Sequence, residues 1–364
     1  MPRVIGIDPG TVSIDICGLD EGRVFLDRSL STARALADPS MLVGLLNDAH
    51  RAAPLDLVAG PSGYGLPLID ARDLTETDIR LAILAADGES GGIGGLRSLM
   101  RELKRSPMPI VLTPGVVHLA SVPPHRKVNR VDMGTADKVC VAALAVREQA
   151  ERRRCVERDV SFILLELGGA FTAAIAVENG RIVDGAGGTS GPLGARAAGA
   201  LDGEVAVLAG SIPKGLLFTG GAATIAGTPD ASAEALTVPT TARGDLAWEA
   251  YLESAVKAVV SLAVSAPRAC EVIISGRFAR IDRVRDELVR RFAAVAAPPV
   301  HPLAGFASVA MQAAQGAALI ADGLAGGTST ALVDALGIRA ASGTVLDHLY
   351  VIMPAAARAR LGMA

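Results

Sequence analysis

The chain has 364 residues, of which 50% are hydrophobic and 20% charged, a composition typical of a globular, water-soluble protein large enough for two domains. A net charge of −3 and an aromatic content of only 3% argue against a nucleic-acid-binding surface and against general attraction to anionic membranes. The four cysteines form no CxxC pair, and neither a signal peptide nor a stretch long enough to span a bilayer is recognisable. We therefore expect a cytoplasmic globular protein with reduced thiols.

Residues 4–30 are predicted to form three consecutive strands joined by short turns. The first turn, at the end of an apolar strand, contains Asp8, Gly10 and Thr11. A carboxylate in this position can bind Mg²⁺, while the backbone N–H groups of a glycine turn can donate hydrogen bonds to phosphate oxygens. The same residue types also occur in ordinary hairpin turns, so the turn alone leaves both interpretations open.

Alternating helices and strands are predicted after this meander. Asp38 is the expected N-cap of a helix that ends before Pro54, and residues 55–59 form a short buried strand. The glycine-rich loop that follows could be only a surface turn, although its glycines would also allow the backbone to approach a ligand closely. The candidate ligand-binding residues of this loop are Ser62, Gly63, Tyr64 and Gly65. A second glycine-rich loop is predicted at residues 87–95.

A basic segment at residues 125–130 directly precedes an acidic helix start. Most charge runs are solvated, but two prolines stiffen the approach to this one, and Arg126 and Lys127 are candidates for contact with an anion. Asp132, Asp137 and Lys138 could be helix-capping or surface charges, or at least one of them could act on a bound ligand. The sequence alone leaves these alternatives open.

The first stretch has a second copy 158 residues further along the chain. The match extends without a gap through three predicted strands and both turns. It includes the pairs Ile5/Ile163, Asp8/Glu166, Gly10/Gly168, Asp20/Glu178, Gly22/Gly180 and Arg23/Arg181. A repeat of this length indicates duplicated domains and not a solenoid. We predict two lobes of one topology, residues 1–158 and 159–364, each with an acidic first turn.

Three glycine-rich positions mark the second half of the chain. The first is the stretch of residues 187–194, and Arg196 directly after it could be a surface charge or could line a pocket. Gly220 and Gly221 follow a short predicted strand, and a later strand ends at Gly276 and Arg277, just before a helix.

The last predicted helix, residues 307–325, is rich in alanine and glycine, so it can pack closely against neighbouring elements. The tail after Val333 is expected to close back over one of the two lobes.

Two lobes with facing acidic turns resemble the superfamily of acetate and sugar kinases, heat-shock chaperones and actin (ASKHA). More narrowly, the whole chain is similar to an uncharacterised family described as predicted butyrate kinases. The resemblance implies an α/β fold of two duplicated ribonuclease H-like lobes with a nucleotide cleft between them. It also implies ATP and Mg²⁺ as cofactors, and a homodimeric assembly.

The resemblance further implies roles for individual residues. Asp8 and Glu166 would contact the metal, although relatives usually carry Asp at the second position, so we expect Glu166 to reach the metal through water. Arg196 would lie near the pocket of the acyl group. The residues expected to bind the nucleotide are Gly10, Thr11, Gly168, Gly169, Gly220, Gly221, Gly276 and Arg277.

The implied activity is phosphorylation of a small carboxylic acid to an acyl phosphate. A carboxylate is ionised at pH 7 and can attack unaided, so the protein must supply alignment and positive charge, for which Arg126, Lys127 and Arg196 are candidates. A hydroxyl-bearing acceptor would instead need a base, and Asp132 or Asp137 would take that role. A nucleotide-binding regulatory protein without catalysis is a third alternative, because the second turn and the adenosine motif match relatives weakly.

Overall fold

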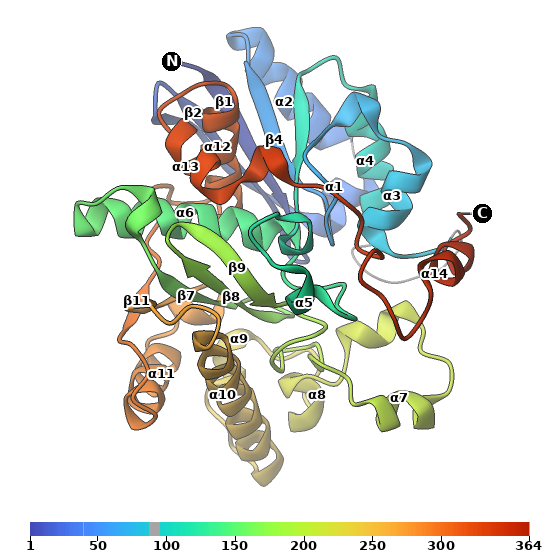
Figure 1. Cartoon of the computed structure of the whole chain (residues 1–364), viewed down its shortest axis with the longest axis vertical. Helices are drawn as coiled ribbons and strands as arrows, with labels where there is room; N and C mark the ends of the chain where they lie inside the picture. Colours follow the sequence, from blue (N-terminus) through green and yellow to red (C-terminus); the bar gives the residue numbers. More distant parts are fainter. Residues whose placement is uncertain (39, 87–94, 364) are drawn as a thin grey trace.

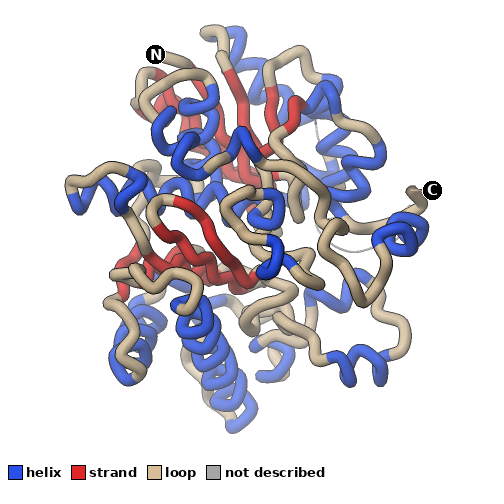
Figure 2. The backbone as a smooth tube through the Cα atoms, in the orientation of Figure 1, coloured by secondary structure: helices blue, strands red, loops and turns tan. Residues whose placement is uncertain are grey.

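The protein forms two α/β lobes, described here from a computed structural model (Figure 1). The structure describes residues 1–38, 40–86 and 95–363, so most of the predicted glycine-rich loop at 87–95 lies outside the described residues. The strands fall into two separate sheets, one in each lobe (Figure 2). None of the helices in the described part of the chain combines the length and the hydropathy that a membrane crossing requires.

The first sheet has the strand order β3-β2-β1-β4-β6-β5. Its strands are β1 (Arg3–Pro9), β2 (Ser13–Asp20), β3 (Arg23–Ser31), β4 (Leu57–Pro61), β5 (Ile69–Asp70) and β6 (Ile110–Thr113). The first three are antiparallel, whereas β4 and β6 run parallel to β1. The accompanying helices are α1 (Thr32–Ala37), α2 (Ser40–Ala52), α3 (Glu76–Ile83), α4 (Leu96–Arg105), α5 (Pro124–Lys127) and α6 (Ala136–Arg153).

The second sheet has the order β11-β10-β7-β8-β9. Its strands are β7 (Phe162–Leu167), β8 (Thr172–Glu178), β9 (Arg181–Ala186), β10 (Val272–Ser275) and β11 (Val300–Pro302). The helices of this half are α7 (Gly203–Ala209), α8 (Ala222–Ala226), α9 (Ala233–Leu236), α10 (Ala242–Ala263), α11 (Asp282–Ala294), α12 (Gln312–Leu324), α13 (Thr330–Leu336) and α14 (Pro354–Arg360). Read from its other edge, this order repeats that of the first sheet without β5.

The duplication extends to details of the backbone. The Gly10 N–H donates to the carbonyl of Ser13 at 2.9 Å, and the Gly168 N–H donates to the carbonyl of Phe171 at the same distance, 158 residues later. The strand pairing also shifts register at equivalent places, between residues 18 and 19 of β2 and between residues 176 and 177 of β8. These shared features confirm the prediction of two lobes built on one topology.

Two helices, α6 and α12, pack together between the sheets (Figure 1). Glycines allow this approach: a Cβ on Gly316 would lie 1.8 Å from the carbonyl oxygen of Cys140 in α6. A Cβ on Gly6 of β1 would lie 2.1 Å from the backbone nitrogen of Ala318 in α12. Such distances exclude any larger residue, so the contact between β1 and α12 depends on the absence of side chains.

The end of the chain returns to the first lobe. Leu332 and Val333 of α13 belong to the same hydrophobic core as β1 and α6, and Arg80 of α3 donates a hydrogen bond to the carbonyl of Gly362. A separate core fills the space between the second sheet and the helices α10 and α11. The tail therefore closes over the first lobe. The boundary at residues 158 and 159 stays a prediction.

The predicted helix at 307–325 begins later than expected, at Gln312. The preceding turn is held by Asp27 of β3, whose carboxylate accepts hydrogen bonds from the backbone N–H groups of Ser308, Val309 and Ala310 at 2.7–2.9 Å. These bonds lower the pKa of Asp27, although its partial burial acts in the opposite direction. They also fix the start of α12 against the first lobe.

Candidate active site

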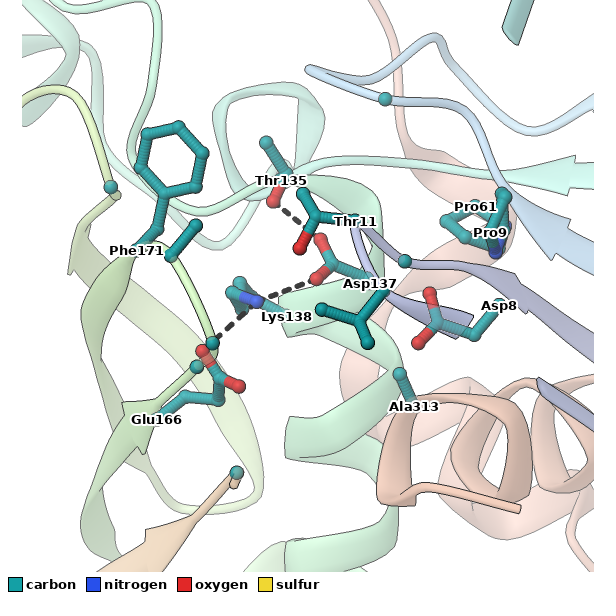
Figure 3. A pocket seen from close by; sticks show the side chains of 18 of the residues that line it. Asp8, Pro9, Thr11, Pro61, Thr135, Asp137, Lys138, Glu166, Phe171 and Ala313 are labelled. Carbon is teal, nitrogen blue, oxygen red and sulfur yellow. Dashed lines mark hydrogen bonds and ion pairs between the residues drawn. The ribbon is translucent and has the colours of Figure 1, made fainter. Parts of the chain in front are cut away.

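A cavity of about 250 Å³ lies between the two lobes, at the ends of β1 and β7 (Figure 3). Both acidic turns contribute to its walls, and Asp8 and Glu166 line it from opposite lobes. The beginning of α6 forms a third wall, between the two turns. The nucleotide-binding candidates in the lining are Gly10, Thr11, Gly168, Gly169, Gly276 and Arg277.

In the first turn, Asp8 faces the cavity and stands directly opposite Asp15 in the pairing of β1 with β2. Asp15 is 2% exposed, and its Oδ2 accepts a hydrogen bond from the Ser13 hydroxyl at 2.8 Å. Its Oδ1 has no hydrogen-bond partner among the described residues. Burial raises the pKa of Asp8 well above its usual value, and the like charges of Asp137, Asp15 and Glu166 raise it further against the opposing effect of Lys138.

At the start of α6, Lys138 joins the two lobes electrostatically. Its Nζ lies 2.6 Å from Oδ2 of Asp137 and 3.0 Å from Oε2 of Glu166 (Figure 3). Burial alone would lower the pKa of Lys138, but the two carboxylates raise it, so the ammonium group is charged at any physiological pH. Burial likewise opposes the charge of Asp137, yet Lys138 and a hydrogen bond from Thr135 lower its pKa.

In the second turn, the surrounding glycines leave room for the Glu166 side chain. Burial raises the pKa of Glu166, and Lys138 only partly offsets this effect. A Cβ on Gly276, at the end of β10, would lie 2.8 Å from Oε1 of Glu166, and one on Gly168 would lie 3.2 Å from its Oε2. Glycine at both positions therefore leaves the space that the carboxylate occupies.

Asp132, which also lines the cavity, is held by backbone and side-chain donors. Its Oδ1 accepts a hydrogen bond from the Gly134 N–H at 3.2 Å, and its Oδ2 accepts two from the N–H and hydroxyl of Thr189, both at 2.9 Å. Burial still raises the pKa of Asp132 above its usual value. The residue fastens the loop after β9 to the start of α6.

The cavity carries an excess of negative charge that suits a bound divalent cation. Five acids line it, Asp8, Asp15, Asp132, Asp137 and Glu166, against three basic side chains, Lys138, Lys214 and Arg277. The described residues contain no group of three or more His, Cys, Asp or Glu side chains that would enclose a metal by themselves. Mg²⁺ in nucleotide sites commonly uses one or two carboxylates and completes its shell with phosphates and water. The donor set therefore fits a nucleotide-bound Mg²⁺ at Asp8.

Some residues of the loop after β4 line the cavity, and the others face the protein interior. Gly63 and Tyr64 line the cavity, as expected for a substrate-binding loop, and the Gly63 carbonyl accepts the N–H of Ala136 at the start of α6. Ser62 instead points inward, because its hydroxyl donates to the Thr113 carbonyl at 2.7 Å. Gly65 packs against Gly115 and His118 and does not line the cavity.

Contrary to the expectation from the basic segment, the structure does not bring Arg126 or Lys127 to the cavity. The guanidinium of Arg126 donates to the Val183 carbonyl at 2.8 Å and lies 3.9 Å from Asp184. Lys127 is 8% exposed, and its Nζ donates to the Leu119 carbonyl at 3.0 Å. Both side chains therefore hold α5 against neighbouring backbone carbonyls and do not point into the cavity.

Arg196 lies in a neighbouring cavity that shares Thr11 and Gly169 with the main one. Gly220 and Gly221 line neither of these cavities. They support Arg196 instead, because the Gly221 N–H donates to the Arg196 carbonyl at 2.8 Å. The expected nucleotide contact of these two glycines remains a prediction.

Two charged cavity residues, Asp15 and Lys214, were not among the candidates chosen from the sequence, whereas Lys138 was considered there together with Asp132 and Asp137. Asp15 interrupts an otherwise apolar strand, and such a buried acid is the signal that could have found it. Lys214 comes from a distant segment, and its Nζ lies 3.4 Å from the hydroxyl of Tyr64. No local pattern predicts this contact between lobes.

The model of one protein family, described as protein of unknown function (DUF1464), matches residues 6–351. No curated protein sequence is significantly similar to the chain. Among solved structures, a propionate kinase from Francisella tularensis subsp. tularensis is similar with a TM-score of 0.65 at 12% identity, covering 87% of this chain and 99% of that one.

An acetate kinase from Porphyromonas gingivalis has a TM-score of 0.57 at 15% identity, covering 81% of this chain and 88% of that one. A proposed N-acetylmannosamine kinase from Listeria monocytogenes has a TM-score of 0.51 at 13% identity, covering 87% and 97%. At these identities the likeness shows the fold alone: the chain shares the two-lobed α/β architecture of these kinases.

Proposed function

We propose that this chain, which belongs to the family described as protein of unknown function (DUF1464), is an ATP-dependent kinase that phosphorylates a small carboxylic acid. One observation carries the proposal: two turns with the same backbone geometry face one cavity, and the Lys138 ammonium lies between them. Two tight glycine turns that let the backbone approach a ligand, with a fixed cation between them, suit a transferring phosphoryl group.

The electrostatics support a nucleotide that binds together with Mg²⁺. An anionic triphosphate alone would be repelled, since the five acids of the described lining outnumber its three basic side chains. Asp8, whose carboxylate has no hydrogen bond or ion pair with the described residues, would hold the metal, with Asp15 reinforcing the negative field. When bound, Mg²⁺ would neutralise phosphate charge during transfer. Lys138 would stabilise the negative charge on the phosphoryl oxygens from the opposite side.

A second cavity, of about 520 Å³, offers a site for the nucleoside. It is lined by Trp248, Tyr251 and Phe278 in the second lobe, and Phe278 follows the cavity residues Gly276 and Arg277. Aromatic walls favour a stacked base. Trp248 is the sole tryptophan of the chain, so its fluorescence would report a nucleotide bound there.

The preference for a carboxylate acceptor rests on the absence of an unengaged base among the described cavity residues. Asp132 accepts three hydrogen bonds, and Asp137 and Glu166 are paired with Lys138. The remaining acids of the lining are Asp8, which the metal would use, and Asp15, which is only 2% exposed and stands opposite Asp8 in the strand pairing. An alcohol acceptor needs a base, whereas a carboxylate is already ionised. Acetate and propionate kinases among the structural neighbours are consistent with this choice.

A hydroxyl-bearing acceptor is the second candidate. It is favoured by the raised pKa of Asp132, which buried surroundings move toward the range of a general base, and by the similarity to a proposed sugar kinase. The first proposal is preferred because a base at Asp132 would have to release two hydrogen bonds from Thr189.

The test is a discontinuous assay with Mg-ATP, hydroxylamine and panels of short carboxylates and of alcohols. Hydroxylamine traps an acyl phosphate as a hydroxamate, so the proposal predicts hydroxamate with at least one carboxylate and none with the Lys138→Met variant. ADP release with an alcohol and no hydroxamate would favour the second candidate. Quenching of Trp248 fluorescence by Mg-ATP without turnover of any acceptor would instead indicate a nucleotide-binding protein without catalysis.

A further inference from the structure

Residues 201–219, here called the excursion, leave the second lobe and return to it at the edge of the active-site cavity. The excursion begins and ends at one place, because Ala197 and Gly220 pair as an isolated antiparallel bridge at its base. It contains α7 and the short helix η4 (Lys214–Phe218). Figure 1 shows α7 standing away from the second sheet, on the side of α14. Compact surface loops whose ends meet are frequently functional.

The excursion is held weakly to the rest of the protein. None of residues 201–219 is buried, and the backbone hydrogen bonds that they make with described residues stay within the excursion. Two glycines with positive φ flank it, Gly199 at 76° and Gly220 at 81°. Segments with few buried contacts open locally at low free energy. The excursion is therefore the part of the cavity wall that can move with the least loss of packing.

Two side chains of the excursion nevertheless complete the wall of the cavity. The Nζ of Lys214 lies 4.4 Å from the centre of the Tyr64 ring and 3.4 Å from its hydroxyl. The ring of Phe218 packs edge-on against that of Phe171, with 5.0 Å between the ring centres. Tyr64 belongs to the first lobe and Phe171 to the second. The excursion therefore bridges both lobes across the cavity.

The part of the cavity beside Tyr64 has apolar walls. The Tyr64 N–H donates to the Ala82 carbonyl at 2.9 Å, so the end of α3 adjoins this ring. With the start of α4, it supplies the lining residues Ala82, Ile83 and Leu96. The pair of phenylalanine rings adds a further apolar surface. A pocket of this kind suits a small apolar group, with its few polar side chains fixing one polar end of the ligand.

The three basic side chains of the described lining serve different parts of the cavity. Lys138 is held between the two turns by its carboxylate partners. Arg277 lies at the second turn, where its Nε would be 3.7 Å from a Cβ on Gly169. Lys214 is the cation beside the apolar part. Its ammonium is thus placed for the charged end of a ligand whose remainder is apolar.

We propose that Lys214 binds the carboxylate group of the acceptor, and that the excursion is a lid that closes over the acceptor and carries this ammonium to it. The inference rests on the proposed kinase function, for which it names a residue that recognises the acceptor. A cation at this place offsets the repulsion between the acceptor carboxylate and the γ-phosphate. The apolar walls favour an alkyl chain, so the acceptor class is a short alkyl carboxylate.

The kinetic test compares Lys214→Met with Lys214→Arg, using the most reactive of acetate, butyrate and hexanoate in the hydroxamate assay. Loss of the charge in Lys214→Met should raise KM for the carboxylate at least about tenfold, equivalent to about 1.4 kcal/mol, and leave KM for Mg-ATP within about threefold. Lys214→Arg keeps the charge and should recover most of this loss. The matched control is Lys257→Met, because Lys257 is 74% exposed on α10 and pairs with Glu253 outside the cavity.

Limited proteolysis tests the lid without turnover. Lys214 is the sole lysine or arginine between residues 201 and 219, so trypsin has one site in the excursion. We expect cleavage there in the ligand-free protein, slowed at least about tenfold by butyrate together with Mg²⁺ and a non-hydrolysable ATP analogue, and less by the nucleotide alone. Cleavage after Arg154, which is exposed at the far end of α6, is the internal control and should not change.

The two experiments separate failure of the lid from failure of the proposed function. Hydroxamate formation with an unchanged carboxylate KM in Lys214→Met would overturn the role of Lys214 while the proposed function stands. Cleavage at Lys214 that the carboxylate does not slow further would overturn the lid. If the wild type turns over no acceptor, the proposed function fails, and protection of the Lys214 site by butyrate still decides whether the excursion closes over a carboxylate.

Discussion

The two acidic turns share a backbone but not an electrostatic environment. In both, a glycine N–H closes the turn onto a carbonyl three residues later at 2.9 Å. Asp8, however, stands beside Asp15 and has no hydrogen bond or ion pair with the described residues, whereas Glu166 is paired with Lys138. The position equivalent to Asp15 in the second lobe is Ala173. The two turns thus keep one backbone geometry, whereas their side chains have diverged: the second turn is paired with Lys138, and the first is not.

Removal of Lys138 should have the largest effect, because this residue separates the two turns. Lys138→Met leaves the buried Glu166 and the partly buried Asp137 without a counter-charge, so we expect a loss of about 3–5 kcal/mol of stability. Activity should fall below detection, as measured by hydroxamate formation at a temperature where the variant is folded. Arg152→Met, which breaks the buried pair with Glu271 away from the cavity, should lose stability but keep kcat. Equal loss of kcat in both variants would contradict this role for Lys138.

The second-largest effect is expected when the acid of each turn is replaced by its amide, because the two replacements should differ in their cost to activity. Asp8→Asn should lower kcat/KM for Mg-ATP by at least about a hundredfold, since it removes the charge assigned to the metal, about 2.7 kcal/mol of transition-state stabilisation. Glu166→Gln should cost only about tenfold, because the amide keeps the size of the side chain and can turn its oxygen toward the Lys138 ammonium, which lies 3.0 Å from Oε2 of Glu166. Asp48→Asn, in an exposed ion pair, is the control. The reverse ranking of the two cavity variants would exchange the roles of the turns.

Local sequence signals were sufficient to predict the duplicated fold, but they predicted only some of the residues of the candidate site. The offset of 158 residues revealed both turns, because glycines and acids at strand ends leave a pattern that survives duplication. The sequence left the role of Lys138 open, because its partner Glu166 comes from the other lobe, which no local pattern indicates. Arg126 was misplaced for a related reason: its direction is set by the Val183 carbonyl of a distant strand. The late start of α12 likewise depends on Asp27, far away in the chain.

A pH titration should reveal the charged state of the first turn. Burial and like charges raise the pKa of Asp8, so protons compete with Mg²⁺, and metal affinity should fall as the pH drops through that raised value. Because the folded-state pKa exceeds the unfolded one, Asp8 contributes stability to the metal-free protein at low pH, and this contribution is lost as the pH rises.

Asp8→Asn should therefore be more stable than the wild type in the metal-free state at pH 7, by about 1.4 kcal/mol for each unit of upward pKa shift. Chemical denaturation at several pH values in the presence of a chelator measures this difference. If Asp8→Asn is the less stable protein at neutral pH, the carboxylate is engaged by a partner and the cation-binding assignment fails.

The smallest expected difference concerns the turns' shared backbone. A Cβ would lie 2.9 Å from the Ser13 carbonyl at Gly10, and 2.8 Å from the Phe171 carbonyl at Gly168. Gly10→Ala and Gly168→Ala should therefore destabilise the protein by similar amounts, on the order of 1–3 kcal/mol in denaturant titrations. Gly44→Ala, where an added Cβ meets no atom within 4 Å, is the matched control. A difference of several kcal/mol between the first two variants would show that the turns are not equivalent.

The most direct measurement is the position of the metal itself. Crystals grown with Mn²⁺ and a non-hydrolysable ATP analogue would locate the ion by its anomalous scattering. The division of roles between the turns predicts a peak on the Asp8 side of the cavity, with Lys138 still bound to Glu166 and the triphosphate between the two glycine turns. A peak coordinated by Glu166, with Lys138 displaced from it, would contradict the account.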